Sequence, residues 1–167
     1  MVRRVDGPIR ICFVCTANLC RSPTALAVAR TLVRDAGLDA RLDSAGTGDY
    51  NVGLPAEERV REEAARRGYD LDDHEGRQFT VADFARFDLV LVMDWHNYQD
   101  LLALEPSPAQ ARKIHYLRDY DAAADDHDVP DPYRRGRRKI AESFDIIEAA
   151  CRGLVARLAV GEREPAR

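Results

Sequence analysis

Hydrophobic and polar positions along the chain fall into two alternating patterns. Short runs of apolar and β-branched residues occur at positions 9–14, 41–45, 87–93 and 113–117. Such runs are typical of strands, and the near-continuous apolar run FDLVLVM at 87–93 is typical of a strand in the middle of a parallel sheet. We therefore predict four strands, of which the fourth has the weakest pattern.

Helical patterns separate these strands. Apolar residues recur at helical spacing over residues 24–35, 55–68, 94–104 and 138–160, and a short helix is expected at 81–84. An alternation of strands and helices predicts an α/β fold with a parallel sheet. We predict a single domain over residues 1–167, with a flexible leader at 1–8 and a flexible tail at 161–167.

Composition and charge exclude several classes of protein. The 167 residues are 46% hydrophobic and 32% charged, which is typical of one folded globular domain. The net charge of −4 argues against a general nucleic-acid binder. No apolar run approaches the ~20 residues of a membrane helix, and the N-terminus lacks the apolar segment of a signal peptide. We expect a cytoplasmic protein with no membrane partner, and export without a signal stays open.

The cysteines are Cys12, Cys15, Cys20 and Cys151. In a reducing compartment they are expected as free thiols. Cys12 and Cys15 form a C-x-x-C pair, but residues three apart in a strand point to opposite faces. The histidines show no ligand spacing either. We therefore expect no metal and no cofactor, with Cys12 and Cys151 in the core.

Cys15 and Arg21 bracket the loop between the first predicted strand and the helix that follows it. Backbone N–H groups of a loop at a helix N-terminus form an anion-binding nest, and the helix dipole adds positive potential. Both effects favour a thiolate and a bound phosphate. A thiolate there can attack phosphorus while the planar guanidinium binds two phosphoryl oxygens. The spacing thus indicates phosphoryl chemistry.

Five motifs in order resemble the low molecular weight protein tyrosine phosphatase family. The loop reads VCTANLCRSP at 14–23, where the family has V-C-x-G-N-x-C-R-S-P. SAGT followed by an aromatic residue occupies 44–53, D-H-x-x-R-Q occupies 73–78, a strand ends in Met93-Asp94, and D-P-Y occupies 131–133. The resemblance covers nearly the whole chain. It implies a three-layer α/β/α fold with a four-stranded parallel sheet, of the phosphotyrosine protein phosphatase I type.

The resemblance also implies roles for individual residues. Cys15 is expected as the nucleophile that forms a phosphocysteine, Arg21 as the phosphate ligand, and Asp131 as the acid that protonates the leaving phenol oxygen and then activates water. The remaining residues of the phosphate-binding loop are Thr16, Ala17, Asn18, Leu19, Cys20 and Ser22. Ser44 and His74 are expected to support the loop, and the substrate pocket walls are expected to be Leu19, Tyr50 and Tyr133.

This chain departs from the family pattern at three positions. Ala17 stands where the family often has Gly, so a positive φ at that position would cost ~1 kcal/mol. Tyr50 stands where many relatives have Trp, which makes one wall smaller. Arg134 follows Tyr133 where some relatives have a second tyrosine, so regulation by phosphorylation there is not implied.

Other functions stay open at this point. Arsenate reductases share this fold and loop, but their thioredoxin-coupled forms use two further cysteines, and this chain has none between Cys20 and Cys151. A phosphopeptide-binding module without catalytic activity would not need all of Cys15, Arg21 and Asp131. Protein arginine phosphatases tend to have Thr where Leu19 stands, and an apolar side chain suits a phenyl ring better. We therefore expect phosphotyrosine-containing protein substrates, with inorganic phosphate or similar oxyanions as product or inhibitor.

The sequence leaves two interpretations open for Cys20 and two for the basic cluster at 134–139. Cys20 is either a packing residue or a thiol that traps oxidised Cys15 as a reversible disulfide. The basic cluster at 134–139 is either a solvated helix start or a surface that attracts the acidic flanks of a phosphopeptide.

Overall fold

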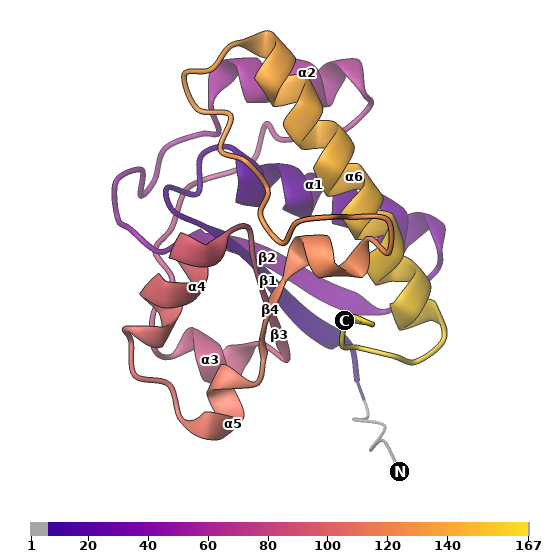
Figure 1. The fold of residues 1–167 in the computed structure, drawn as a ribbon. Coiled ribbons are helices and arrows are strands. Elements are labelled where there is room, and N and C mark those ends of the chain that lie inside the picture. Colours follow the sequence, from indigo (N-terminus) through magenta and orange to yellow (C-terminus); the bar gives the residue numbers. More distant parts are fainter. Residues whose placement is uncertain (1–6, 167) are drawn as a thin grey trace.

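One parallel sheet forms the middle of the protein (Figure 1). The computed structural model describes residues 7–166. The sheet contains β1 (Ile9–Cys15), β2 (Ala40–Gly46), β3 (Leu89–Val92) and β4 (Ile114–Tyr116), in the order β2-β1-β3-β4. The chain passes outward from β1 to β2 and then returns across β1 to β3. The carboxyl end of β1 therefore lies at the switch in strand order, where α/β folds bind ligands.

Helices cover both faces of this sheet, so the predicted three-layer α/β/α fold is confirmed. In Figure 1, α1 (Arg21–Asp35) and α6 (Arg137–Ala159) lie on one face. The helices on the other face are α3 (Asp83–Arg86), α4 (Trp95–Leu102) and α5 (Pro108–Ala111). The 3-10 turn η1 (Leu117–Tyr120) follows β4, and α2 (Glu58–Arg66) packs on the first half of α6.

Three helical segments differ from the sequence expectation. The helix expected from residue 55 begins at Glu58, because the Glu57 carboxylate accepts the Val60 N–H and caps the helix there (3.0 Å). The short helix expected at 81–84 lies two residues later. The pattern did not predict α5, because a reciprocal pair of hydrogen bonds between Ser107 and Gln110 fixes this single turn without a repeating apolar face.

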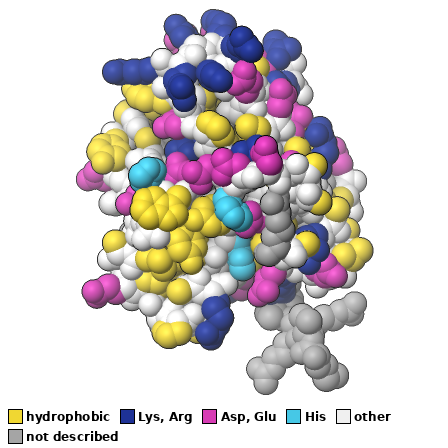
Figure 2. Space-filling view, viewed as in Figure 1, with side chains coloured by type: hydrophobic (Ala, Val, Ile, Leu, Met, Phe, Trp, Pro, Cys, Tyr) yellow, Lys and Arg dark blue, Asp and Glu magenta, His cyan; other side chains and the backbone are white. Residues whose placement is uncertain are grey.

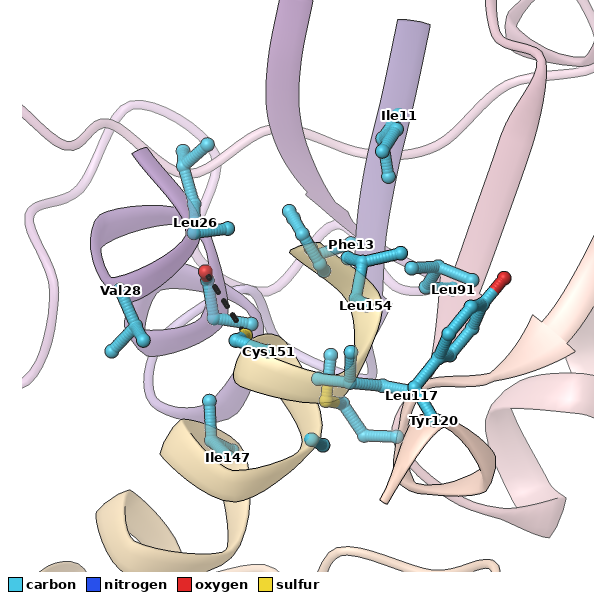
Figure 3. Close-up of a cluster of buried hydrophobic side chains, with 14 of the residues drawn as sticks. Ile11, Phe13, Leu26, Val28, Leu91, Leu117, Tyr120, Ile147, Cys151 and Leu154 are labelled. Carbon is cyan, nitrogen blue, oxygen red and sulfur yellow. Dashed lines mark hydrogen bonds between the residues drawn. The ribbon is translucent and has the colours of Figure 1, made fainter. Parts of the chain in front are cut away.

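The alternation of β1 divides its side chains between two apolar clusters. Cys15 packs with α1 and α6 on one face, and Cys12 packs against α3 and α4 on the other. Figure 3 shows the first cluster, in which the Cys151 thiol donates to the Ala25 carbonyl (3.8 Å). The core positions predicted for Cys12 and Cys151 are thus confirmed. All four cysteines are free thiols.

The ends of the chain are only partly described. Residues 1–6 of the expected leader and residue 167 of the expected tail lie outside the described residues, and their expected flexibility stays a prediction. Within residues 161–166, Tyr120 donates a hydrogen bond to the Arg163 carbonyl, and Arg157 pairs with Glu162 (2.7 Å). Over residues 7–166, no helix has the length and apolar character needed to cross a membrane.

Candidate active site

In the loop that follows β1, the backbone carbonyl groups point outward and the N–H groups point inward. The carbonyl oxygens of residues 15–19 each accept a hydrogen bond from a donor outside the loop. These donors are the Thr47 and Gly48 N–H groups, the Asn51 amide, the His74 ring and the Glu57 N–H. In a trans peptide the N–H points opposite to the C=O. The N–H groups of residues 16–20 therefore face the inside of the loop and form an anion-binding nest.

Gly46 lets the end of β2 approach this loop closely. A Cβ atom at Gly46 would lie 2.7 Å from the carbonyl oxygen of Thr16 and 3.1 Å from the backbone nitrogen of Asn18. Both contacts are with backbone, which cannot move aside without opening the nest. The glycine of the SAGT motif is thus required by the loop it supports.

Asn18 sets the shape of the loop from its centre. Its backbone lies in the left-handed region (φ 53°), and its side chain is buried. The side-chain oxygen accepts the Arg77 N–H (3.0 Å), so the amide nitrogen donates to Ser22 Oγ (2.8 Å) and Ser44 Oγ (3.0 Å). The residue with positive φ is therefore Asn18. Ala17 carries no such backbone cost, which removes the strain considered for that substitution.

The donor and acceptor roles of Asn18 and Ser22 determine which group faces the Cys15 sulfur. Cys15 is almost fully buried, and its Sγ lies 2.9 Å from Ser22 Oγ. Because Asn18 donates to Ser22, the hydroxyl proton of Ser22 is free to point at the sulfur. A hydroxyl that donates to a thiolate stabilises the charged form. Within the described residues, Ala45 offers the Ser22 hydroxyl its other acceptor, at 3.4 Å.

Arg21 places a cation at the floor of the site. Its guanidinium is 3% exposed, and Nη1 donates to Asp94 Oδ2 (2.6 Å) and to the Val129 carbonyl (2.9 Å). Burial opposes its charge, but the charges of Cys15 and Asp94 prevail and raise the pKa of Arg21 above its usual value. The second terminal nitrogen, Nη2, faces the carboxylate of Asp131 at 3.8 Å.

Asp131 reaches the site on a long segment that is attached to the sheet. The N–H of Val129 donates to the Met93 carbonyl at the end of β3 (2.7 Å), and the Val129 carbonyl accepts from Arg21. The Asp131 side chain is 54% exposed, and one oxygen accepts the Tyr133 N–H (3.1 Å). The acid therefore stands at the mouth of the site rather than in its floor.

A single cavity of about 390 Å³ joins these groups. Its lining residues are Cys15, Thr16, Ala17, Leu19, Cys20, Arg21, Tyr50, Asn51, Asp131 and Tyr133. The structure thus brings the expected nucleophile, cation, acid and walls into one pocket, with Asn18, Ser22, Ser44 and His74 packed behind it. No group of three His, Cys, Asp or Glu side chains suited to a metal occurs in residues 7–166.

Comparison with known proteins places this geometry in a family. A model of the family described as low molecular weight phosphotyrosine protein phosphatase matches residues 10–164. The chain belongs to that family. The resemblance expected from the five motifs is therefore confirmed over nearly the whole chain.

Individual proteins similar to this chain support the assignment to this family. A low molecular weight protein-tyrosine-phosphatase of Streptomyces coelicolor is 46% identical over 151 residues, which cover 88% of this chain and 92% of that protein. The crystal structure of a protein tyrosine phosphatase from Entamoeba histolytica superposes with a TM-score of 0.87 at 35% identity, covering 92% and 98%. A Drosophila arginine phosphatase superposes with a TM-score of 0.83 at 30% identity, covering 90% and 98%. The fold alone does not separate the two substrate classes.

Asp94 and Asn97 are site residues of this phosphatase-family chain that the sequence did not assign. Asp94 holds Arg21 with one oxygen and caps α4 with the other, which accepts the Asn97 N–H (2.8 Å). Asn97 is fully buried and donates to Thr16 Oγ1 (3.0 Å). The motif Met93-Asp94 pointed to Asp94 in the sequence but did not indicate its role. No sequence motif pointed to Asn97, because its contact with Thr16 depends on how α4 meets the loop.

Arg77 supports the loop from behind. Its backbone N–H orients the amide of Asn18, and its side chain pairs with Asp43 (3.0 Å) and with the fully buried Asp83 (3.0 Å). Arg86 also pairs with Asp83 (3.0 Å) but has no contact with Asn18 among the described hydrogen bonds. The D-H-x-x-R-Q motif contains Arg77, although the sequence assigned a role only to His74 within it.

The pocket walls differ in exposure. Tyr50 is 71% exposed and Tyr133 is 45% exposed, so both rings stand at the mouth, whereas Leu19 is half-buried. Cys20 is buried beside the nest, and burial raises the pKa of its thiol above the usual value. Cys20 therefore stays protonated at neutral pH and does not compete with Cys15 for the role of thiolate.

Proposed function

We propose that the protein hydrolyses phosphotyrosine in protein substrates through a phosphocysteine on Cys15. The observation that carries the proposal is the ring of inward N–H groups around Cys15, with Arg21 at its floor. This ring matches the oxygens of a phosphoryl group, and the charge that spreads over those oxygens in the transition state is met by preorganised donors.

In the first step the Cys15 thiolate attacks phosphorus and forms the S–P bond. The bond from phosphorus to the phenol oxygen breaks, and Asp131 gives its proton to that oxygen so that a neutral phenol leaves. Asp131 is suited to this step because it stands at the mouth, where the leaving group lies. The Ser22 hydroxyl and the fork of Arg21 favour the thiolate and the transferred phosphoryl group.

In the second step a water molecule attacks phosphorus, and Asp131, now a carboxylate, accepts a proton from it. The S–P bond breaks, the Cys15 thiolate is restored, and inorganic phosphate leaves. Structures of relatives support oxyanion binding at such a site: one is described as a Vibrio vulnificus protein in complex with benzylphosphonate and another as an Escherichia coli tyrosine phosphatase in complex with sulphate.

Phosphotyrosine fits the walls better than phosphoarginine. Tyr50 and Tyr133 line the mouth of the pocket with aromatic rings, and Leu19 adds an apolar side chain to the same lining. A guanidinium needs hydrogen-bond partners, and the Leu19 side chain offers none. We place the activity in the cytoplasm, on phosphotyrosine-containing proteins.

A turnover comparison tests this proposal. Matched peptides that carry phosphotyrosine, phosphoarginine or phosphoserine are incubated with the full chain and with Cys15→Ser in buffer without added metal. We expect phosphotyrosine to be fastest and Cys15→Ser to be inactive. Normal turnover by Cys15→Ser contradicts the phosphocysteine, and faster phosphoarginine turnover contradicts the substrate class.

Two further arms sharpen this comparison. Leu19→Thr is expected to shift relative turnover toward phosphoarginine, because it replaces an apolar wall by a hydroxyl. Arsenate reduction coupled to thioredoxin is measured on the same samples. Reduction faster than phosphotyrosine hydrolysis contradicts the phosphatase in favour of a redox enzyme.

A further inference from the structure

Charge is distributed unevenly over the molecule. The chain has a net charge of −4, yet residues 57–62 and 134–139 together contain seven basic and three acidic side chains. Figure 2 shows dark blue side chains crowded at one end, where Figure 1 places α2 and the start of α6, and a magenta band across the middle. We call residues 57–62 and 134–139 the basic end. Its field is opposite to that of the whole chain.

Part of this positive charge is neutralised locally. Arg137 pairs with Glu62 (2.5 Å), and Arg138 and Lys139 share Glu142 (3.2 and 2.8 Å). The ion pairs found over residues 7–166 include none of Arg59, Arg61, Arg134 and Arg135. Of these four arginines, Arg59 and Arg134 line a groove beside the active site.

Arg59 and Arg134 both line one groove, Arg59 from α2 and Arg134 from the segment before α6. The groove has a volume of about 570 Å³ and runs between the first turn of α2 and the segment 132–136. It shares Leu19, Cys20 and Tyr133 with the active-site pocket. The Arg134 guanidinium lies 5.2 Å from the centre of the Tyr133 ring. The groove therefore begins at the wall of the phosphotyrosine pocket.

Two acidic residues, Glu57 and Glu58, also line the groove. The Glu57 carboxylate accepts the Val60 N–H at the N-cap of α2, and the exposed Glu58 lies in the first turn of the same helix. Negative side chains at these positions compensate the positive end of the helix dipole. The excess of seven basic over three acidic side chains in the basic end therefore still sets the sign of the field over the groove.

We propose that this groove binds the substrate segment that flanks the phosphotyrosine, and that Arg59 and Arg134 select acidic side chains in it. An extended chain advances ~3.3 Å per residue, so the residues next to the phosphotyrosine enter a groove that starts at Tyr133. The inference rests on the proposed function and adds the substrate class: phosphotyrosine within an acidic sequence.

Paired peptides test this inference. One phosphotyrosine peptide carries glutamate at the positions on both sides of the phosphotyrosine, and its partner carries glutamine at the same positions. We expect kcat/KM to be about threefold to tenfold higher for the glutamate peptide, since two exposed ion pairs contribute modestly. We expect raised ionic strength to reduce this preference.

Variants locate the preference. The double variant Arg59→Gln/Arg134→Gln is expected to bring the ratio of the two peptides close to one. Arg41→Gln/Arg112→Gln is the matched control, because it removes the same charge at two exposed arginines by the amino ends of β2 and β4, away from the nest. This control is expected to keep the wild-type ratio. Arg59→Gln alone is expected to hydrolyse para-nitrophenyl phosphate, which has no flanking residues, at the wild-type rate.

The outcomes separate the two proposals. If both peptides are hydrolysed at equal rates by the wild type, the groove inference is wrong and the proposed function stands. If the control double variant loses the preference as fully as the groove variant, the effect comes from overall charge, and the groove is again excluded. If no phosphotyrosine peptide is hydrolysed, the proposed function itself fails.

Discussion

The phosphate-binding loop and the segment that carries Asp131 border the same pocket, but they are held in different ways. In the loop, Asn18 and Ser22 are buried and lie within hydrogen-bond distance of fixed partners. The Asp131 segment is attached through Asp128 and Val129, and the acid itself is 54% exposed. One side of the pocket is preorganised and the other is open to solvent.

This difference is consistent with the roles that the proposed function gives to each side. Donors that meet the charge of the transition state are most effective when they are already oriented, because no reorganisation is then needed. An acid that serves a leaving group has to sit where the rest of the substrate enters, and that place is the mouth. The contrast between a rigid floor and an exposed acid is therefore expected to appear in the response of each side to substitution.

The largest effect is expected at the floor. Arg21→Lys keeps the positive charge but removes the fork that holds Asp94 and the Val129 carbonyl and that, in the proposed mechanism, also binds the phosphoryl group. We expect kcat/KM on a phosphotyrosine peptide to fall by about 10³-fold. Thermal unfolding of the variant checks that the fold is kept. A fall of less than about tenfold would show that charge alone suffices at this position.

Asp131→Ala is the matching change at the mouth. We expect kcat on phosphotyrosine to fall by about 10²-fold, with KM and the unfolding midpoint little changed because the side chain is exposed. Para-nitrophenyl phosphate has a better leaving group and is expected to lose less. Steady-state kinetics on both substrates measure the difference. Equal losses on the two substrates would argue against a role as the acid.

The sequence predicted the parts of this contrast that depend on local patterns. The strand, loop and helix around Cys15 follow from an apolar run, a five-residue connection and Pro23, all of which act within a short stretch of chain. The same holds for the four strands, whose apolar runs are bounded by polar residues. The motif Asp131-Pro132-Tyr133 likewise indicated, through a resemblance of neighbouring residues, a carboxylate that the structure places at the pocket; its role as the acid stays a prediction.

The sequence did not predict what depends on contacts between distant segments. The positive φ at Asn18, rather than at Ala17, depends on the His74 and Arg77 contacts that hold the loop from behind. Asn97 meets Thr16 only because α4 starts beside the nest. The sequence showed the basic cluster at 134–139, but not that it meets Arg59 of α2 along one groove, because that depends on how α2 packs beside the start of α6.

Arg77 and Arg86 offer a smaller and sharper test of the support behind the floor. Both pair with Asp83 at 3.0 Å, but only Arg77 orients Asn18 through its backbone. We expect Arg77→Gln to lower kcat by about twofold to tenfold, the effect of one or two loosened hydrogen bonds. Arg86→Gln is expected to leave kcat unchanged.

The measurement for this pair is kcat together with the rate of Cys15 alkylation at one fixed pH. We expect alkylation of Arg77→Gln to be slower, because a looser Asn18 no longer directs the Ser22 proton to the sulfur. If Arg86→Gln changes kcat and Cys15 alkylation as much as Arg77→Gln does, the effect comes from the ion pair with Asp83, and Arg77 has no separate role in positioning the loop.

The smallest expected effect distinguishes His74, which is buried, from His115, which is half-buried. Burial lowers the pKa of both His74, behind the loop, and His115, on β4. An unfolded histidine titrates near pH ~6.5, so the unfolded state takes up protons first as the pH falls, and the free energy of unfolding decreases below that pH. The decrease levels off only below the lowered pKa of the folded state.

We therefore expect His74→Asn and His115→Asn each to weaken the loss of stability between about pH 7 and pH 5.5, as measured by denaturant unfolding. Only His74→Asn is also expected to lower kcat, because its Nε2 donates to the Asn18 carbonyl (2.9 Å) while His115 has no contact with the loop among the described hydrogen bonds. If the two variants lower kcat equally, the activity depends on general stability, and the rigid floor has no separate role in the pocket.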